Sequence, residues 1–187
     1  MRVIAGACRG RRLVAPEGSS TRPTGDRVRE ATFNALASLD ALDGAEVIDL
    51  FAGSGALGIE ALSRGAAHVT FVDQDRRAIT AVEANLATTG LAARATVVRA
   101  PARRVLDEAR AGGRGWGLAL LDPPYAFEDW DDLLAALPAQ LAVVESDRSV
   151  PVPEGWRAIR ERRYGATLVA ILRSQPPAAL SGLDPSE

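Results

Sequence analysis

The fold of this chain is decided by the stretch Val47-Ile48-Asp49-Leu50-Phe51-Ala52-Gly53-Ser54-Gly55-Ala56-Leu57-Gly58. Its apolar beginning, residues 46–51, predicts a buried strand, and the Ala-Gly-Ser-Gly that follows predicts a tight turn into a helix. The glycines have the spacing G-x-G-x-x-G, in which the missing side chains let a ligand approach the bare backbone. The stretch therefore predicts a ligand-binding turn between a strand and a helix.

Asp73 ends the next predicted strand, twenty residues after Gly53. An acidic side chain at this distance is placed to hydrogen-bond the hydroxyls of a ribose. Together, the glycine turn and this carboxylate predict a cofactor that contains a nucleoside. They do not choose between NAD and S-adenosylmethionine.

Strand-like and helix-like segments alternate through the rest of the chain, which favours an α/β fold with a largely parallel twisted sheet covered on both faces. The last two strands lack a helix between them and predict an antiparallel hairpin that closes the sheet. The expected strands are residues 46–51, 68–72, 95–99, 118–121, 141–145, 157–162 and 167–173. The expected helices that separate them include 76–88, 102–111 and 130–137.

Three parts follow from this organisation: an N-terminal extension over residues 1–40, the main domain over 41–174 and a flexible tail over 175–187. In the extension, Arg2–Ala5 and Arg11–Ala15 predict a short hairpin. Apolar residues at helical spacing from Val28 to Leu39 predict a helix, with Asp26 placed to cap its start.

A second motif, Asp122-Pro123-Pro124-Tyr125, follows the apolar strand that ends at Leu121. It therefore extends from the carboxyl end of the sheet, where open α/β folds bind their ligands. Two prolines stiffen the backbone and remove N–H donors, leaving carbonyls that accept. A carboxylate beside a rigid carbonyl suits an exocyclic amine, which offers two hydrogens, and Tyr125 offers a flat ring for stacking a base.

The composition bounds the protein class. With 187 residues, 47% hydrophobic and 25% charged, the chain is of ordinary globular size and composition. Short apolar runs, an N-terminus without an apolar core and a single cysteine lead us to expect a cytoplasmic protein without a membrane span, disulfide or metal site. We interpret Trp116, Trp130 and Trp156 as packing residues.

The charge is unevenly distributed. The total is −2, with an isoelectric point near 5.6, which argues against indiscriminate binding of nucleic acids. The first thirty residues nevertheless carry seven arginines against three acids. Because arginine makes bidentate contacts with phosphate, this segment is a candidate RNA-binding surface. The arginines that we expect to contact RNA are Arg11, Arg12, Arg22 and Arg27.

The two motifs together resemble class I S-adenosylmethionine-dependent amino-methyltransferases. The flanking segments Gly10–Leu13, Thr21–Ala31 and Gly58–Ala66 narrow the resemblance to the bacterial 16S rRNA guanine-N2-methyltransferase family. The resemblance runs over about residues 2–173 and implies a Rossmann-like class I methyltransferase fold.

The resemblance also implies roles for individual residues. Asp122, Pro123 and Tyr125 would hold the target guanine. The residues that would bind S-adenosyl-L-methionine are Asp49, Phe51, Gly53, Ser54, Gly55, Asp73, Gln74 and Ala102. Pro101 departs from the family pattern, in which a polar side chain lies near the adenine, so a backbone group near Ala100 or Ala102 would take over that role.

The resemblance implies methyl transfer to the exocyclic N2 of a guanine in 16S ribosomal RNA. The partner would be the small ribosomal subunit or an assembly intermediate, and we expect a monomer. An adenine-N6 methyltransferase acting on DNA or RNA remains open, because the second motif suits either amine. An NAD-dependent oxidoreductase and a non-catalytic RNA-binding assembly factor also remain open.

Overall fold

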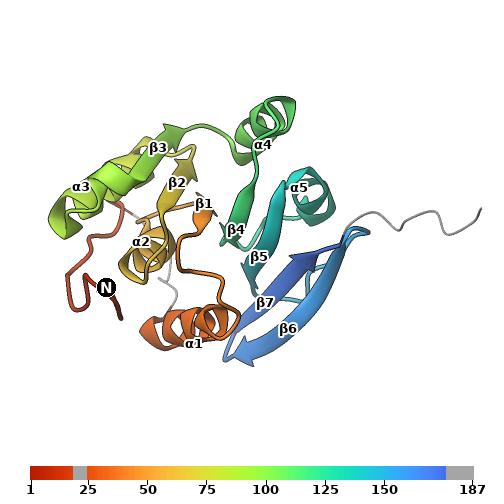
Figure 1. Ribbon diagram of the computed structural model, residues 1–187, viewed down its shortest axis with the longest axis horizontal. Coiled ribbons are helices and arrows are strands. Elements are labelled where there is room, and N and C mark those ends of the chain that lie inside the picture. Colours follow the sequence, from red (N-terminus) through yellow and green to blue (C-terminus); the bar gives the residue numbers. More distant parts are fainter. Residues whose placement is uncertain (19–24, 176–187) are drawn as a thin grey trace, which may run out of the picture.

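A computed structural model describes residues 1–18 and 25–175 of the chain. Figure 1 shows one twisted sheet with helices on both faces. The elements in chain order are α1 (Asp26–Ala37), β1 (Glu46–Leu50), α2 (Ala56–Ser63), β2 (His68–Asp73), α3 (Arg76–Thr89), η1 (Ala92–Arg94), β3 (Ala95–Arg99), α4 (Ala102–Ala111), β4 (Trp116–Leu121), α5 (Trp130–Ala136), β5 (Ala139–Ser146), β6 (Trp156–Tyr164) and β7 (Thr167–Ser174).

The strand order is β3-β2-β1-β4-β5-β7-β6. The first five strands of this order pair in parallel, and β7 pairs antiparallel with both β5 and β6. The predicted α/β fold class, mostly parallel sheet and C-terminal hairpin are therefore confirmed. The chain order reverses between the neighbouring strands β1 and β4, which is where open sheets of this kind bind ligands beyond their carboxyl ends.

Side chains from the two faces of the sheet form two apolar cores. One core joins Val47, Phe71 and Leu120 of the strands to α1, α2 and α3. The other joins Ile48, Leu121 and neighbouring strand residues to α4 and α5. Figure 1 shows the two groups of helices on opposite faces. Burial on both faces explains why these strands are continuous apolar runs without alternation.

The predicted core elements agree with the structure, and the differences lie at their ends. The helix expected over 102–111 has those bounds, while the strand expected at 118–121 begins at Trp116. Trp116, Trp130 and Trp156 are buried in the core with α4 and α5, as expected of packing residues.

The N-terminal arm, residues 1–18, differs from the prediction. The chain doubles back, with Val3 N–H donating to the Arg11 carbonyl at 3.0 Å and Leu13 N–H to the Met1 carbonyl at 3.0 Å. In this arm one isolated bridge, Arg2 to Arg12, takes the place of the two strands that the sequence predicted. The predicted short hairpin is therefore present only as a doubled-back chain with a single antiparallel bridge, because the arm forms most of its hydrogen bonds with helices.

Two buried side chains of α2 bind the arm. The carboxylate of Glu60 accepts from Ile4 N–H at 2.8 Å and from Ala5 N–H at 3.0 Å. Ser63 Oγ accepts from Cys8 N–H at 2.9 Å and donates to the Ala5 carbonyl at 2.6 Å. These contacts fix a segment that has little regular structure of its own.

The prediction that Asp26 caps α1 is wrong. Gly25 is the N-cap residue and Asp26 is the first residue of the helix. Its carboxylate instead accepts from the guanidinium of Arg29 at 3.0 Å. Arg29 is 1% exposed and also donates to the Arg2 carbonyl, so α1 is connected to the arm through a buried arginine.

Candidate cofactor and target-base site

Three carboxylates lie at the carboxyl edge of the sheet, on neighbouring strands. Asp49 is in β1, Asp73 ends β2 and Asp122 follows β4 directly. The register pairs Leu50 of β1 with Val72 of β2 and with Leu121 of β4, so the three strands end side by side. The structure thus brings together acids that are far apart in sequence.

Asp49 is almost fully buried, at 1% exposure. Its Oδ2 accepts a hydrogen bond from the N–H of Gly58 at 2.9 Å. Burial raises the pKa of Asp49 well above its usual range; the Gly58 hydrogen bond opposes this shift, and the negative charges of Asp122 and Asp73 add to it. A cation bound at this edge would relieve the repulsion between the three carboxylates.

Asp73 holds the glycine turn to the end of β2. Its Oδ2 accepts from Gly53 N–H and its Oδ1 from Asp75 N–H, both at 2.9 Å. An ionised carboxylate has about four lone-pair positions, so each oxygen can accept one more hydrogen. The side chain is partly exposed and therefore accessible to the hydroxyls of a ribose.

The turn requires glycine at two positions for different reasons. Gly55 has φ +75°, and a Cβ there would lie 3.2 Å from Val82 Cγ2 and 3.3 Å from Phe71 Cε1. A Cβ on Gly58 would lie 2.3 Å from Phe71 Cε1, so α2 packs directly against β2. The three-glycine spacing is thus used for a tight turn and for close helix–strand packing.

The start of α2 distinguishes between the two candidate cofactors. A pyrophosphate binds to free N–H groups at a helix N-terminus. Here the Gly58 N–H, in the first turn of α2, already donates to the Asp49 carboxylate. The same carboxylate would repel a pyrophosphate, so the donor set suits a cationic, hydroxyl-bearing ligand such as S-adenosylmethionine and disfavours NAD.

Phe51 connects the glycine turn to the target loop, a contact that the sequence motifs did not indicate. Its backbone has φ +62°, a left-handed conformation that is uncommon for a bulky residue. Its ring packs edge-on against Phe127 at 5.4 Å, and Phe127 packs against Trp130 at 5.1 Å. An aromatic pair of this kind contributes about 0.5–1.5 kcal/mol beyond its burial.

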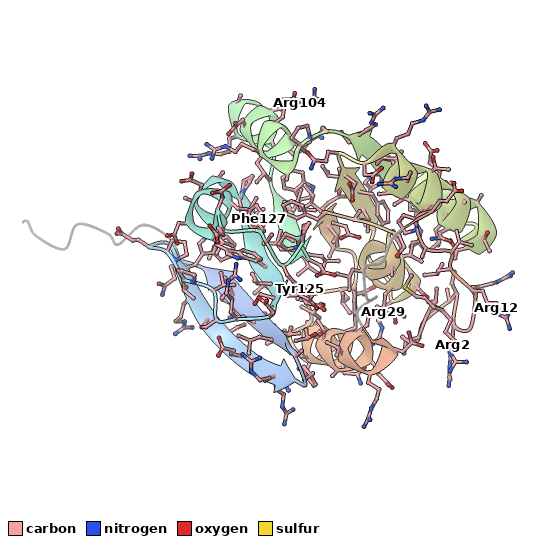
Figure 2. The ribbon with its side chains drawn as sticks, turned by 180° about the vertical axis from the view of Figure 1, so that it is seen from behind. Arg2, Arg12, Arg29, Arg104, Tyr125 and Phe127 are labelled. Carbon is pink, nitrogen blue, oxygen red and sulfur yellow. The ribbon has the colours of Figure 1, made fainter. Side chains whose placement is uncertain are left out.

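The target loop runs from Asp122 to Phe127. Pro123 is buried and Asp122 partly buried, while Tyr125 is 54% exposed. Phe127 N–H donates to the Pro124 carbonyl at 2.8 Å and closes the turn. In Figure 2, Tyr125 lies near the middle of the molecule, between the sheet and α1. An exposed ring on the same loop as a carboxylate and a proline-stiffened carbonyl is what a flat base needs for stacking and hydrogen bonding.

Residues expected near the adenine lie around the end of β2. Gln74 is exposed beside Asp73, and Ala102 is the first residue of α4. The Ala100 N–H donates to the Asp73 carbonyl at 3.0 Å and is therefore occupied. The first N–H groups of a helix have no intrahelical partner. Because Pro101 has no polar side chain, the Ala102 N–H is the better candidate to bind the adenine edge.

Asn85 of α3 is a second residue that sequence reasoning missed. Its Nδ2 donates to the Ser54 carbonyl at 2.8 Å and to the Val14 carbonyl at 2.9 Å, and its Oδ1 accepts from Val14 N–H at 2.8 Å. A polar residue among the alanines and leucines of the buried helix face was the available signal. Asn85 therefore fixes the glycine turn and the arm at once.

The arginines predicted to bind RNA are not part of this edge cluster. Arg11 and Arg12 are exposed on the arm and Arg27 is exposed on α1, whereas Arg22 lies outside the described residues. Figure 2 shows Arg12 extending into solvent on one side of the molecule, away from Tyr125. Their role as RNA contacts stays a prediction.

The described surface is also hollowed away from the carboxylate edge. A hollow of about 520 Å³, lined by Asp40, Gln140, Arg173 and neighbours, lies at the opposite edge of the sheet, where β4 and β5 begin. Within residues 1–18 and 25–175, no group of three or more His, Cys, Asp or Glu side chains is arranged to hold a metal. No helix in this part of the chain is both long and apolar enough to cross a membrane.

Comparison with known proteins gives relatives that span nearly the whole chain. The family described as "Conserved hypothetical protein 95" matches residues 1–173. The Bacillus subtilis (strain 168) protein named "Putative rRNA methyltransferase YlbH" is 43% identical over 185 residues, which cover 94% of this chain and 100% of the relative. The Escherichia coli (strain K12) protein named "Ribosomal RNA small subunit methyltransferase D" is 39% identical over 175 residues, covering 88% of this chain and 85% of the relative.

A solved structure supports the same conclusion about the fold. The Escherichia coli structure titled "Putative methyltransferase yhhF" superposes with a TM-score of 0.81 at 36% identity, covering 94% of this chain and 98% of that one. The resemblance drawn from the two motifs is therefore confirmed, as is the class I methyltransferase fold.

Proposed function

The chain belongs to the family described as Conserved hypothetical protein 95, and from this premise we propose that it methylates the exocyclic N2 of a guanine in 16S ribosomal RNA, with S-adenosylmethionine as methyl donor. The name of its Escherichia coli relative, a small-subunit ribosomal RNA methyltransferase, supports the substrate class. The resemblance of the target loop and its flanking segments to guanine-N2-methyltransferases supports the choice of atom.

One observation carries the choice of cofactor: a buried carboxylate, Asp49, accepts the Gly58 N–H at the start of α2. With Asp73 and Asp122 on the adjacent strand ends, the edge is negative and suits the positive charges of S-adenosylmethionine. When bound, this cofactor would supply a methyl group on a sulfonium, from which a neutral thioether is an excellent leaving group.

The residues of the edge would hold different parts of the cofactor. Asp49, Gly53 and Gly55 would bind its methionine end, together with Phe51 and Ser54 of the same turn. Asp73 would accept from the ribose hydroxyls. Gln74 and the Ala102 N–H would contact the adenine.

The target loop holds the amine during the reaction. Asp122 and the Pro123 carbonyl accept from its two hydrogens, which orients the nitrogen and favours its rehybridisation. As the new bond to the methyl carbon forms, the bond between that carbon and sulfur breaks, and the nitrogen releases one of its two protons to solvent. Tyr125 stacks on the guanine ring, an interaction worth about 1–3 kcal/mol per base. A base in a helix cannot reach this loop, so the target is unpaired or flipped out. Catalysis then rests mainly on positioning and on the exclusion of water.

Specific observations distinguish the proposed activity from its alternatives. An NAD-dependent oxidoreductase is disfavoured by the carboxylate that occupies the Gly58 N–H. An adenine-N6 methyltransferase would use the same target loop, and the relatives' names favour ribosomal RNA over DNA. A non-catalytic assembly factor would have no need for Asp122 beside the glycine turn.

We also propose which parts of the chain carry out catalysis and which contact the RNA. Residues 41–174 form the methyltransferase domain, and residues 1–40 form an extension that contacts RNA through Arg11, Arg12, Arg22 and Arg27. The enzyme acts as a cytoplasmic monomer on the small ribosomal subunit or an assembly intermediate.

The test is methylation of small ribosomal subunits purified from cells that lack the enzyme. Labelled S-adenosylmethionine is added, and the RNA nucleosides are identified by mass spectrometry. We expect N2-methylguanosine with the wild type and transfer reduced by about 10²–10³-fold in Asp122→Ala, because the amine loses an acceptor. Tyr125→Phe should stay active and Tyr125→Ala should lose substrate capture. N6-methyladenosine as the product, or normal turnover by Asp122→Ala, would contradict the proposal.

A further inference from the structure

The C-terminal hairpin of β6 and β7 is strongly basic. It contains five arginines and a single acid, Glu161. The arginines are Arg157, Arg160, Arg162, Arg163 and Arg173. The net charge of +4 equals that of the first thirty residues, whereas residues 31–155 carry ten arginines against eighteen acids. The near-neutral total therefore conceals two basic regions separated by an acidic one.

The register places most of these arginines on one face. Arg157, Arg160 and Arg162 are paired with Arg173, Ile171 and Val169 of β7, respectively. Ile171 and Val169 belong to the core shared with α1, so the three β6 arginines are on the α1 side of the sheet. An irregularity between Ala158 and Arg160 keeps Arg157 on this face despite the odd spacing.

The charge of these arginines is not balanced within the described residues. Arg157 lies directly across from Arg173, and like charges in this position destabilise a sheet. In the part of the chain that the structure describes, no ion pair joins Arg157, Arg160, Arg162 or Arg173 to a carboxylate. A polyanion on this face would supply the missing counter-charge.

Protection of the sheet edge does not explain the sign of the charge. β6 is the last strand of the sheet, and charged side chains on an edge strand prevent pairing with another sheet. Either sign, or a mixture, would serve that purpose. Five arginines against one glutamate indicate a partner that is negative along its length.

The turn end of the hairpin adjoins the target loop, whereas Arg157 and Arg173 lie at its other end, beside the start of β5, where Arg173 pairs with Leu141. Leu168 near the start of β7 pairs with Ser146 at the end of β5, so the β6–β7 turn lies at the carboxyl edge of the sheet. Arg163 Nη1 donates to the Asp147 carbonyl at 3.4 Å, and Arg148 Nη2 donates to the Phe127 carbonyl at 3.1 Å. These contacts connect the hairpin through the β5–β6 connection to the loop that presents Tyr125.

From this placement we infer that the β6–β7 hairpin is a second RNA-contact surface, which binds phosphates of the RNA backbone that leads away from the target base along β6. Figure 2 shows Tyr125 between the hairpin and the side of the molecule that carries Arg2 and Arg12. The RNA therefore spans α1, with its target base at Tyr125 and its backbone on basic surfaces to either side. This inference rests on the proposed function, because it takes RNA to be the substrate.

The test compares two triple variants that remove the same charge. Arg157→Gln/Arg160→Gln/Arg162→Gln alters the hairpin. The control, Arg103→Gln/Arg104→Gln/Arg110→Gln, alters α4, where Arg103 and Arg104 are already paired with Asp107 and Glu108. Arg104 lies far from Tyr125 in Figure 2. Binding of transcribed 16S rRNA and of unmodified small subunits is measured across a salt series, alongside KM, kcat and cofactor affinity.

Each phosphate that the protein no longer neutralises reduces the slope of log affinity against log salt by about 0.7–0.9. We expect the hairpin variant to lose about two units of slope and to raise KM at least ten-fold, with kcat and cofactor affinity unchanged. The α4 variant should behave like the wild type. An unchanged slope and KM in the hairpin variant, or an equal loss in the α4 variant, would overturn the inference.

The salt series also separates this inference from the proposed function. If the wild type methylates small subunits and the hairpin variant has the same slope and KM, the hairpin is not an RNA-contact surface and the proposed function is retained. If the wild type does not methylate small subunits, and only the hairpin variant loses salt-dependent RNA binding, the hairpin is an RNA-contact surface and the proposed function is wrong.

Discussion

The glycine turn and the N-terminal arm are both irregular backbone, but the molecule fixes them in different ways. The turn is bound by carboxylates at the ends of the strands beside it, with Asp73 accepting from Gly53 N–H and Asp49 from Gly58 N–H. The arm is bound by Glu60, whose carboxylate lies 56 residues from Ile4 in the sequence. One region depends on local geometry, and the other depends on the tertiary fold.

This difference predicts how each region responds to mutation. A change in the turn should act on ligand binding, because the carboxylates there also face the cofactor site. A change under the arm should act on stability, because it exposes buried charges and backbone groups. Asn85 touches both regions and should act on both.

The largest effect is expected from Glu60→Gln. Glu60 is fully buried, with Arg64 Nε 2.7 Å and Arg29 Nε 3.9 Å from its carboxylate. A glutamine leaves Arg64 without its counter-charge and Arg29 with Asp26 alone, and it can accept from only one of the two arm N–H groups. We expect a loss of about 3–5 kcal/mol in the free energy of unfolding, measured by denaturant titration. The control Glu83→Gln, exposed on α3, should be silent, and equal stability of the two variants would refute the role of Glu60.

Asn85→Ala should affect both regions. It leaves the Val14 N–H and the Val14 and Ser54 carbonyls without their partner. We expect a stability loss at the upper end of about 1–3 kcal/mol, together with weaker cofactor binding. Unfolding and calorimetric titration measure the two effects separately. A variant that loses stability but binds cofactor normally would show that the arm and the turn are independent.

Asp73→Ala should act on binding more than on folding. The variant loses the acceptor for the Gly53 and Asp75 N–H groups and the proposed partner of the ribose. We expect cofactor affinity to fall by about 1–3 kcal/mol, the range for hydrogen bonds to a charged group. Titration calorimetry measures the change. Asp75→Ala removes the carboxylate that caps α3 and serves as the control; equal affinity losses in the two variants would argue against a direct contact by Asp73.

The smallest effect is the pH dependence of Asp49→Asn. Because burial raises the pKa of Asp49 above its unfolded value of 3.8, the folded state binds this proton more tightly. Stability from this group is therefore present at low pH and is lost as pH rises from the unfolded to the folded pKa. Asparagine keeps an acceptor for the Gly58 N–H without the charge. We expect the variant to be the more stable apo protein at neutral pH and the difference to shrink in acid, as unfolding titrations across pH would show.

The sequence predicted the sheet and the edge because their signals are local. The strand from Glu46, the glycine spacing and Asp73 lie within thirty residues, and Asp122 follows an apolar strand directly. The residues that were missed act across long separations. Nothing near Phe127 in the sequence indicates that its ring meets Phe51, and no local pattern predicts that Glu60 replaces the partner strand of the arm.

The distribution of charge shows the same contrast between features that are local in sequence and features that only the fold reveals. The arginines of the first thirty residues were recognised because they are concentrated at one end of the chain. A charge count over the rest of the chain hides the arginines of β6, because the acids of residues 31–155 outweigh them. Only the sheet register shows that Arg157, Arg160 and Arg162 share a face. A composition count cannot resolve a face, because alternate residues of a strand point to opposite sides.

The central claim is that the carboxylate edge of the sheet binds S-adenosylmethionine. Calorimetric titration of the wild-type protein with S-adenosylmethionine and, separately, with NAD tests it most directly. The account predicts saturable binding of S-adenosylmethionine and none of NAD, since the Asp49 carboxylate occupies the Gly58 N–H that a pyrophosphate would need. Tight binding of NAD, with no heat from S-adenosylmethionine, would contradict it.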